Sequence, residues 1–267
     1  MQANASARHR RTALTVLAVA VAVAFGGAAC GSLDADPKST KGPAGATAEK
    51  PAEAFPGLSG PEIANRAVTA TKAATSLTLD VTLKTADGPQ KGYMAISKKG
   101  DCAGTLSVGS DGTAELIKTG GTAYLRFDEA LLRSQNKGAP ADEQEAVLEM
   151  MKGRWIKTAA SDAEARDSLE LCDLNKLLAD VEANDTAARR VGETTVGGRK
   201  AVKLTESDGK ETYTMYVAAE GEPYLLKFEQ VGGEEPGTMT FSGFDRPVPA
   251  KKPAAKDILD LDKLGKQ

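Results

Sequence analysis

Histidine, a common side chain for acid–base catalysis near neutral pH, occurs once in the 267 residues, as His9. The chain beyond it can therefore form neither a Ser-His-Asp or Cys-His catalytic arrangement nor a histidine-ligated metal site. Two carboxylate pairs could do acid–base chemistry, Glu220 with Glu222 and Glu234 with Glu235, but they stand among glycine and proline residues typical of solvated turns. No phosphate-binding loop, nucleophile elbow or metal-ligand cluster is found. We predict that the protein is not an enzyme, with no catalytic residue, metal or cofactor.

Cysteine is the other residue type with chemical potential, and the chain has three. Two of them, Cys102 and Cys172, lie in the part that we expect to be exported, where an even number of thiols is typical of a disulfide. A bridge between residues 70 apart would stabilise the fold by about 4 kcal/mol in the chain-entropy model. A redox pair or a soft-metal site is the alternative, but neither cysteine belongs to a Cys-x-x-Cys motif.

The third cysteine, Cys30, follows a typical export signal. The chain begins with a basic stretch, continues with an apolar run over residues 12–25 and then has four small residues. A transmembrane helix is an alternative because the uncharged run continues to Leu33, although its 14-residue apolar part is short for a bilayer about 30 Å thick. We predict a signal peptide over residues 1–29.

The residues around the cysteine indicate the kind of signal. The sequence Ala28-Ala29-Cys30-Gly31 resembles a bacterial lipobox, in which the peptide is cut before an acylated cysteine. The resemblance implies a lipoprotein anchored to the outer face of the cell membrane through Cys30 by acyl chains such as palmitate. Each buried methylene adds about 0.8 kcal/mol, so two or three chains hold a protein persistently. Ordinary secretion and an uncleaved anchor are the alternatives.

The predicted mature chain is mildly acidic. Cleavage before Cys30 removes three arginines and no acid, which leaves 31 basic and 37 acidic side chains and a net charge of −6. Binding to nucleic acid depends on basic residues that neutralise phosphates. We therefore expect no nucleic-acid partner.

Behind the anchor we predict a tether, one domain and a tail. Residues 30–57 are rich in Pro, Gly, Ala, Lys and Glu and offer little to bury, which favours a flexible tether with a reach of about 25–30 Å. Residues 58–250 have an ordinary size for one domain. Residues 251–267 form a charged C-terminal tail with a weak helical pattern.

The domain is predicted to start with one helix and to continue as strands. The helix runs from Ser59 to about Thr75, with Pro61 near its first turn. Residues 76–84 then alternate between aliphatic and polar side chains, which indicates a half-buried strand. Further strands, separated by Asp-Gly, Gly-Gly or similar turns typical of hairpins, are expected at 93–97, 105–108, 114–117, 122–127, 199–204, 211–217, 224–230 and 238–244.

Between the two groups of strands we predict three helices, over residues 128–136, 141–152 and 162–183, where apolar residues recur at helical spacing. Trp155 lies in a short strand or turn before the third helix. Strands, then helices, then strands predict an α+β domain, in which helices gather on one face of an antiparallel sheet.

Four segments carry a resemblance to a known group. They are VGETTVGGRKAVKL at 191–204, YVA with GEPYLLK at 216–227, TFSGFD with PV at 240–248, and GRWIK at 153–157. These segments and the order of elements resemble the actinobacterial LppX/LprG-type lipoproteins, whose fold is related to the LolA/LolB lipoprotein carriers. The resemblance implies a strongly curved antiparallel sheet, an incomplete barrel, with helices covering the concave face and enclosing an apolar cavity for acyl chains.

Strand alternation suggests which side chains face such a cavity. The candidates are aliphatic and aromatic residues of the strands and methionines of the covering helices, since methionine adapts to irregular apolar ligands. They are Leu79, Val81, Leu83, Leu125, Phe127, Met215, Leu226 and Phe228 in the strands, with Met150 and Met151 in a helix. An ordinary packed core would give the same alternation and remains the alternative.

Two functions are consistent with this sequence. The first is a membrane-anchored extracytoplasmic lipoprotein that binds or carries a lipid or other apolar ligand non-covalently. The alternative is a ligand-free interaction or sensor module for other envelope proteins. The low aromatic content of 4% slightly favours the module, because apolar binding sites commonly use aromatic side chains.

Overall fold

The computed structural model describes residues 53–86, 88–162, 169–179, 181–182, 186–234 and 236–260, and the structural statements below concern this part of the chain. The predicted signal peptide, Cys30 and the tether up to residue 52 lie outside it. Within the described ranges, no helix combines the length and the apolar character needed to cross a membrane.

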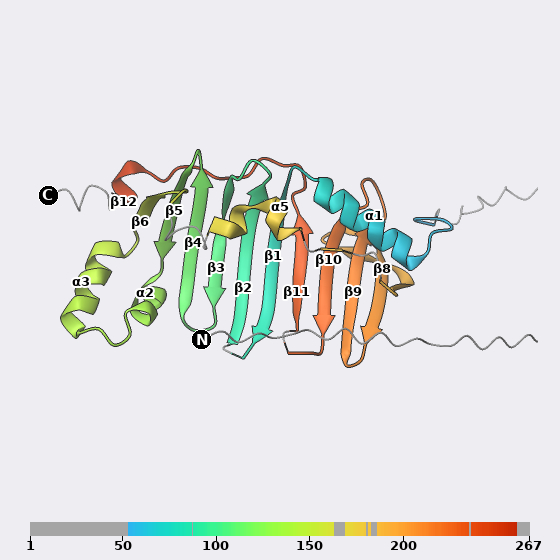
Figure 1. The fold of residues 1–267 in the computed structure, drawn as a ribbon, viewed down its shortest axis with the longest axis horizontal. Coiled ribbons are helices and arrows are strands. Elements are labelled where there is room, and N and C mark those ends of the chain that lie inside the picture. The colour runs from blue at the N-terminus through green and yellow to red at the C-terminus, as the bar shows by residue number, and fades with distance from the viewer. Residues whose placement is uncertain are drawn as a thin grey trace, which may run out of the picture. The chain divides into compact units, whose positions relative to one another are not determined.

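Twelve strands of the described chain form one sheet (Figure 1). Along the chain they are β1 (Ser76–Thr85), β2 (Gly88–Ser97), β3 (Cys102–Val108), β4 (Gly112–Thr119), β5 (Thr122–Phe127), β6 (Trp155–Ala159), β7 (Arg189–Val196), β8 (Arg199–Asp208), β9 (Glu211–Ala218), β10 (Leu225–Val231), β11 (Gly237–Ser242) and β12 (Ile258–Asp260). Their order across the sheet is β12-β6-β5-β4-β3-β2-β1-β11-β10-β9-β8-β7. All neighbours are antiparallel except β12 and β6. The edge strands do not pair with each other, so the sheet is open, as predicted.

Helix α1 (Gly60–Ala73) confirms the first predicted helix, and local chemistry explains both of its ends. At the start, Ser59 and Glu62 form a capping box, in which the Ser59 N–H donates to Glu62 Oε2 at 2.8 Å and the Glu62 N–H donates to Ser59 Oγ at 3.4 Å. At the end, Lys98 Nζ donates to the carbonyls of the last two helical residues at 2.6 and 3.1 Å. A cation is favourable there because it complements the helix dipole.

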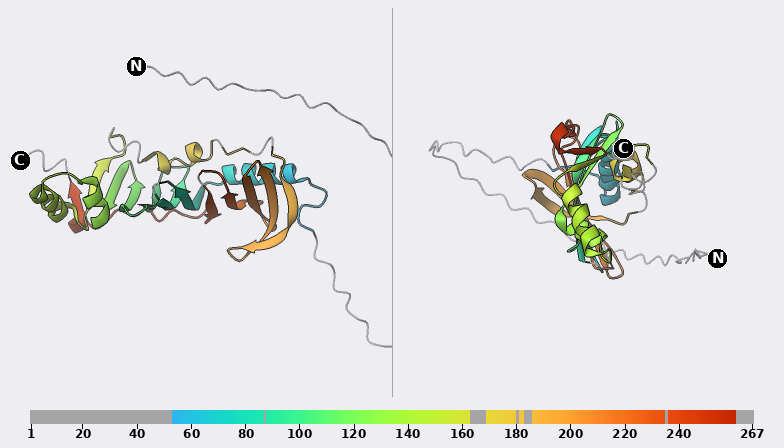
Figure 2. Two further views of the ribbon diagram at one scale, coloured as in Figure 1. Left: turned by 90° about the horizontal axis from the view of Figure 1, so that it is seen from below. Right: turned by 90° about the vertical axis from the view of Figure 1, so that its left-hand side faces the viewer.

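Side chains alternate between two faces of the sheet. One face, here called the covered face, carries Leu77, Leu79, Val81 and Leu83 of β1 and the side chains in register with them on the other strands. Helix α1, the 3-10 turn η1 (Glu170–Cys172) and helix α5 (Leu174–Leu177) lie across this face (Figures 1 and 2). The opposite side, the outer face, carries the residues between them, such as Thr78 and Asp80. Figure 2 also shows strands bending at the β7 end of the sheet.

The central helices differ from the prediction. Helix α2 (Glu129–Gln135) packs on β4, and helix α3 (Ala141–Met151) packs on α2 at the β6 end of the sheet, so neither lies over the middle of the covered face (Figure 1). The predicted helix at 162–183 is mostly wrong where it is described. Asp173 has an extended backbone that separates η1 from α5, and its side chain accepts hydrogen bonds from the N–H groups of Asn175 and Lys176 at 3.0 and 3.2 Å.

The C-terminal segment also differs from the helical pattern that the sequence suggests. A short 3-10 turn, η2 (Ala255–Asp257), leads into β12, which pairs in parallel with β6. The sheet therefore continues past residue 250, the predicted end of the domain. Residues 261–267 lie outside the described chain.

Candidate ligand-binding cavity

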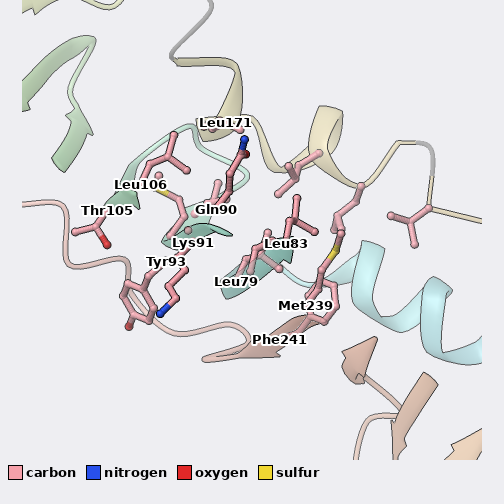
Figure 3. Close-up of a pocket in the computed structure, with 17 residues that line it drawn as sticks. Leu79, Leu83, Gln90, Lys91, Tyr93, Thr105, Leu106, Leu171, Met239 and Phe241 are labelled. Atoms are coloured by element: carbon pink, nitrogen blue, oxygen red, sulfur yellow. The ribbon is translucent and has the colours of Figure 1, made fainter. Parts of the chain in front are cut away.

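A cavity of about 310 Å³ lies between the covered face and the segment formed by η1, α5 and the residues after them. Its floor comes from β1, β2, β3 and β11, which are neighbours in the sheet. The segment above the floor, residues 170–182 without the undescribed residue 180, is called the roof below. Figure 3 shows the lining side chains.

The floor has a depression at Gly92 of β2, where the covered face has no side chain. Val81 of β1 pairs with Gly92 of β2, which in turn pairs with Leu106 of β3. A methyl group on Gly92 would lie 3.6 Å from Leu106 Cδ1, so this leucine occupies part of the space above the glycine. On the other side, Leu83 pairs with Gly237 of β11, and its side chain fills the space above this glycine, because a methyl group there would lie 2.5 Å from Leu83 Cδ2. The depression that the roof closes from above therefore lies over Gly92.

The larger floor side chains surround this depression. Leu79 pairs with Met94 on one side and with Phe241 on the other, and Val81 pairs with Met239. All of these side chains line the cavity. Methionine side chains are flexible and polarisable, so they can adapt to an apolar ligand of irregular shape.

The roof contributes four aliphatic side chains and is held at two points. The lining residues are Leu171, Leu177, Leu178 and Val181. The predicted disulfide joins Cys172 of η1 to Cys102 of β3, with their Cα atoms 5.4 Å apart and both side chains fully buried. Beyond α5, Lys72 Nζ of α1 donates to the carbonyl of Ala179 at 3.0 Å.

Among the described residues, almost no polar side chain faces the cavity. On the floor, Gln90 brings a polar side chain to the covered face, in register with Leu83. Lys91, Tyr93 and Thr105 also border the cavity, but strand alternation places their side chains on the outer face, and Figure 3 shows Lys91 and Tyr93 pointing away from Leu106. No ionisable side chain of the described lining therefore faces the ligand space, which suits an apolar ligand.

Two lining side chains show where the cavity meets solvent. Leu106 of β3 is 37% exposed and Leu171 of η1 is 39% exposed. Both line the cavity, so each of these side chains borders the cavity and the solvent at once. The cavity therefore opens between β3 and η1.

The predicted pocket residues fall into three groups. Leu79, Val81 and Leu83 line the cavity. A second group lies on the covered face, in register with the first, but outside the lining: Leu125, Phe127, Met215 and Phe228. Leu125, Met215 and Phe228 pack against the main hydrophobic core.

The remaining candidates do not reach the covered face above the floor strands. The predicted orientation of Leu226 is wrong, because an irregularity between Leu225 and Lys227 shifts the register and turns Leu226 to the outer face, where it packs with Ala201 and Ala218. Met150 and Met151 lie in α3, beside α2 at the β6 end of the sheet. Cys30 lies outside the described residues.

The sequence reasoning also missed lining residues. Met94, Ile96 and Leu106 follow the same alternation as β1, but their face becomes evident only once β2 and β3 are placed in register. Met239 and Phe241 enter through the pairing of β1 with β11, some 160 residues apart, for which the sequence carries no local signal.

The described residues offer no alternative metal chemistry. Among them, no group of three or more His, Cys, Asp or Glu side chains is arranged so that it could hold a metal ion. The described carboxylates of the two pairs considered for acid–base chemistry, Glu220, Glu222 and Glu234, all lie on exposed turns. Glu220 accepts a hydrogen bond from Lys200 Nζ at 2.8 Å, which raises the pKa of that lysine.

No protein-family model matches the chain, and no curated protein matches it. Among solved structures it is similar to LprF from Mycobacterium bovis, with 14% identity, 73% of this chain and 97% of that chain covered, and a TM-score of 0.49. It is also similar to the Mycobacterium tuberculosis lipoprotein LppX, with 14% identity, 72% and 97% covered, and a TM-score of 0.44. A Vibrio parahaemolyticus protein described as an outer membrane lipoprotein-sorting domain has 12% identity, 72% and 94% covered, and a TM-score of 0.25. LprF and LppX are of the kind that the sequence resembles; likenesses this distant concern the fold and not the ligand.

Proposed function

We propose that this protein is a membrane-anchored extracytoplasmic lipoprotein that binds a lipid or other apolar ligand non-covalently in the cavity under the roof. The observation that carries the proposal is the cavity itself, which is apolar on floor and roof and has no charged side chain facing it in the described lining. Burial of an apolar ligand there would gain about 25 cal/mol per Å² of surface removed from water.

The route into the cavity follows from the exposed lining residues. An acyl chain would enter between Leu106 and Leu171 and extend along the floor toward Met239. Any polar headgroup would stay at this opening, because the interior offers little to bind it and an unpaired buried polar group costs free energy. Neither bonds nor protons change in this mechanism.

Anchoring through acylated Cys30 would keep this domain next to its ligand source. The described chain begins beside β7 and α1, where Arg190 Nη1 contacts Glu53 Oε1 at 2.8 Å and Phe55 packs against the core. The tether, from Cys30 to this attachment point, would let the domain reach the membrane surface in more than one orientation. A Cys30→Ser variant should incorporate no labelled palmitate, whereas the unchanged chain should be labelled and found with membranes.

Native mass spectrometry of the full chain, extracted in a nonionic detergent, tests the ligand proposal. We expect the mass of a non-covalently bound lipid in addition to the mass of the covalent acyl chains. Organic extraction should remove the bound lipid and leave the covalent acyl chains in place. In the matched variant Val81→Phe, the new ring would occupy the space above Gly92 and the bound mass should fall at least about tenfold.

The same substitution at an exposed position provides the control. Val191 of β7 is 58% exposed, so Val191→Phe should retain the bound lipid. Absence of any non-covalent lipid, together with no binding of an added fluorescent fatty acid, would contradict the proposal and favour the interaction-module alternative.

A further inference from the structure

A second hollow, of about 420 Å³, lies on the outer face, behind the sheet from the roof and α1. Its walls come from the β7–β8 turn, the start of β10, the end of β11 and the turn after β11. Val196 and Leu226 give it an apolar base. We call it the outer hollow, and it plays no part in the proposed function of the cavity.

One wall of the outer hollow is a fixed aromatic pair. The rings of Tyr224 and Phe244 stack with their centroids 4.0 Å apart and their planes 3° apart. Tyr224 Oη donates to Asp245 Oδ2 at 2.6 Å, which, together with burial, raises the pKa of Tyr224 to about 12. The adjacent carboxylate of Asp245 also accepts hydrogen bonds from the N–H and Oγ1 of Thr75, at 2.7 and 2.8 Å. Its charge is thus already engaged by three donors.

The remaining polar side chains of the outer hollow are hydrogen-bond donors without a partner among the described residues. Arg199 and Arg246 both line it, are exposed, and form no ion pair with another described residue. By contrast, Arg126 contacts Glu115 at 2.7 Å and Arg133 contacts Glu129 at 2.9 Å. The lining holds no Asp or Glu. An acceptor-rich anion is therefore the complementary ligand.

Two hydroxyl groups in the outer hollow are further hydrogen-bond donors for such an anion. Thr240 and Ser242 of β11 line it from the outer face, and within the described chain neither hydroxyl makes a hydrogen bond. Two guanidinium forks and two hydroxyls match the several acceptor oxygens of a phosphate group, which arginine binds in a bidentate manner. The aromatic pair and the apolar base would contact the organic part that carries the phosphate.

We propose that the outer hollow is a second binding site, for a phosphate group carried on a small organic body. Arg199 and Arg246 bind the phosphate oxygens, and the Tyr224–Phe244 pair contacts the organic part. The same chemistry occurs in a phospholipid headgroup and in a soluble phosphate ester. The outer hollow and the cavity lie on opposite faces of the sheet and share one lining residue, Phe241.

Isothermal titration calorimetry on the full chain in a nonionic detergent tests this site. The probes are dihexanoyl phosphatidic acid and glycerol 3-phosphate, with dihexanoylglycerol and glycerol as their phosphate-free counterparts. We expect at least one phosphate-bearing probe to bind and its counterpart to bind at least about tenfold more weakly. Binding of phosphatidic acid alone identifies a lipid headgroup as the source, and binding of both identifies a phosphate ester in general.

Variants separate this site from general electrostatic attraction and from the cavity. Arg199→Ala with Arg246→Ala should weaken binding at least about tenfold. Arg189→Ala should not change it, because Arg189 of β7 is equally exposed and forms no ion pair with another described residue but does not line the outer hollow. Val81→Phe, which tests the cavity, should also leave phosphate binding unchanged. The proposal is overturned if no phosphate-bearing probe binds, if the phosphate-free counterparts bind equally well, or if the double arginine variant retains full affinity while its thermal unfolding matches that of the unchanged chain.

Discussion

The covered face of the sheet has two halves that are closed in different ways. At the β7 end, α1 packs directly on the strands, and Ile63 of the helix and Val202, Leu204 and Val217 of the sheet are all fully buried. Over β1, β2, β3 and β11 the roof leaves a cavity of about 310 Å³. The same alternation of aliphatic side chains therefore builds a solid core in one half and a lined space in the other.

The length of the covering element explains the difference. Helix α1 has 14 residues, about 21 Å at 1.5 Å per residue, which spans about four strands at 4.8 Å spacing. Helix α5 has four residues, about 6 Å, and spans little more than one strand. The short helix α5 in the described roof, with Gly92 in the floor beneath it, leaves the space above these strands unfilled.

The largest expected effect concerns how the roof is attached. Replacing both bridge cysteines, Cys102→Ser with Cys172→Ser, should lower the free energy of unfolding by about 4 kcal/mol, because a closed loop spanning 70 residues is released in the unfolded chain. Urea unfolding measures this loss, and reduction of the unchanged chain should reproduce it. Hydrogen exchange should rise in the roof of the folded variant while α1 stays protected. A loss below about 1 kcal/mol would mean that the roof does not depend on the bridge.

A second prediction compares one leucine from each half. Leu204→Ala, under α1, should lower the free energy of unfolding by about 3 kcal/mol, because a fully buried side chain leaves an empty space. Leu79→Ala, in the cavity floor, should cost about 1 kcal/mol, because the side chain already borders an open space and loses fewer contacts. Thermal or urea unfolding of both variants gives the two values. Equal losses would show that the cavity half is packed like the core half.

Local sequence patterns predicted much of this fold. Ser59 and Pro61 marked the start of α1, alternation over residues 76–84 predicted β1, and the glycine turns predicted antiparallel neighbours. These features depend on residues a few positions apart. The even number of cysteines in the part of the chain that we predict to be exported predicted the bridge.

The position of the cavity could not be predicted in the same way. It depends on β1 meeting β11 across the sheet, on the shift near Leu225 that turns Leu226 outward, and on the break at Asp173 that shortens the roof. Each is decided by packing between distant segments. The periodic leucines of residues 171–181 would have suited a long helix equally well, so the pattern alone predicted a different cover.

The smallest predicted effect is the pH dependence of one contact in the α1 half. Hydrogen bonds from Tyr224 and from Thr75, which follows α1, lower the pKa of Asp245. Because folding lowers this pKa, the carboxylate stabilises the fold at pH values above the usual aspartate pKa near 4. The contribution is lost as the pH falls through the lowered pKa. Because solvent screens this exposed carboxylate, the contribution is small. Urea unfolding should show Asp245→Asn slightly less stable than the unchanged chain at pH 7, with the difference shrinking toward pH 2; a constant difference would contradict this.

Methionine methyl NMR tests the central claim most directly, because methionines lie both in and away from the cavity. With ¹³C-methyl methionine in the full chain, addition of a fatty acid should shift the signals of Met94 and Met239, which line the cavity. The signals of Met150 and Met151 in α3 should stay unchanged, and Val81→Phe should abolish the shifts. If the fatty acid leaves Met94 and Met239 unchanged, or shifts the α3 methionines equally, the cavity under the roof is not the ligand site.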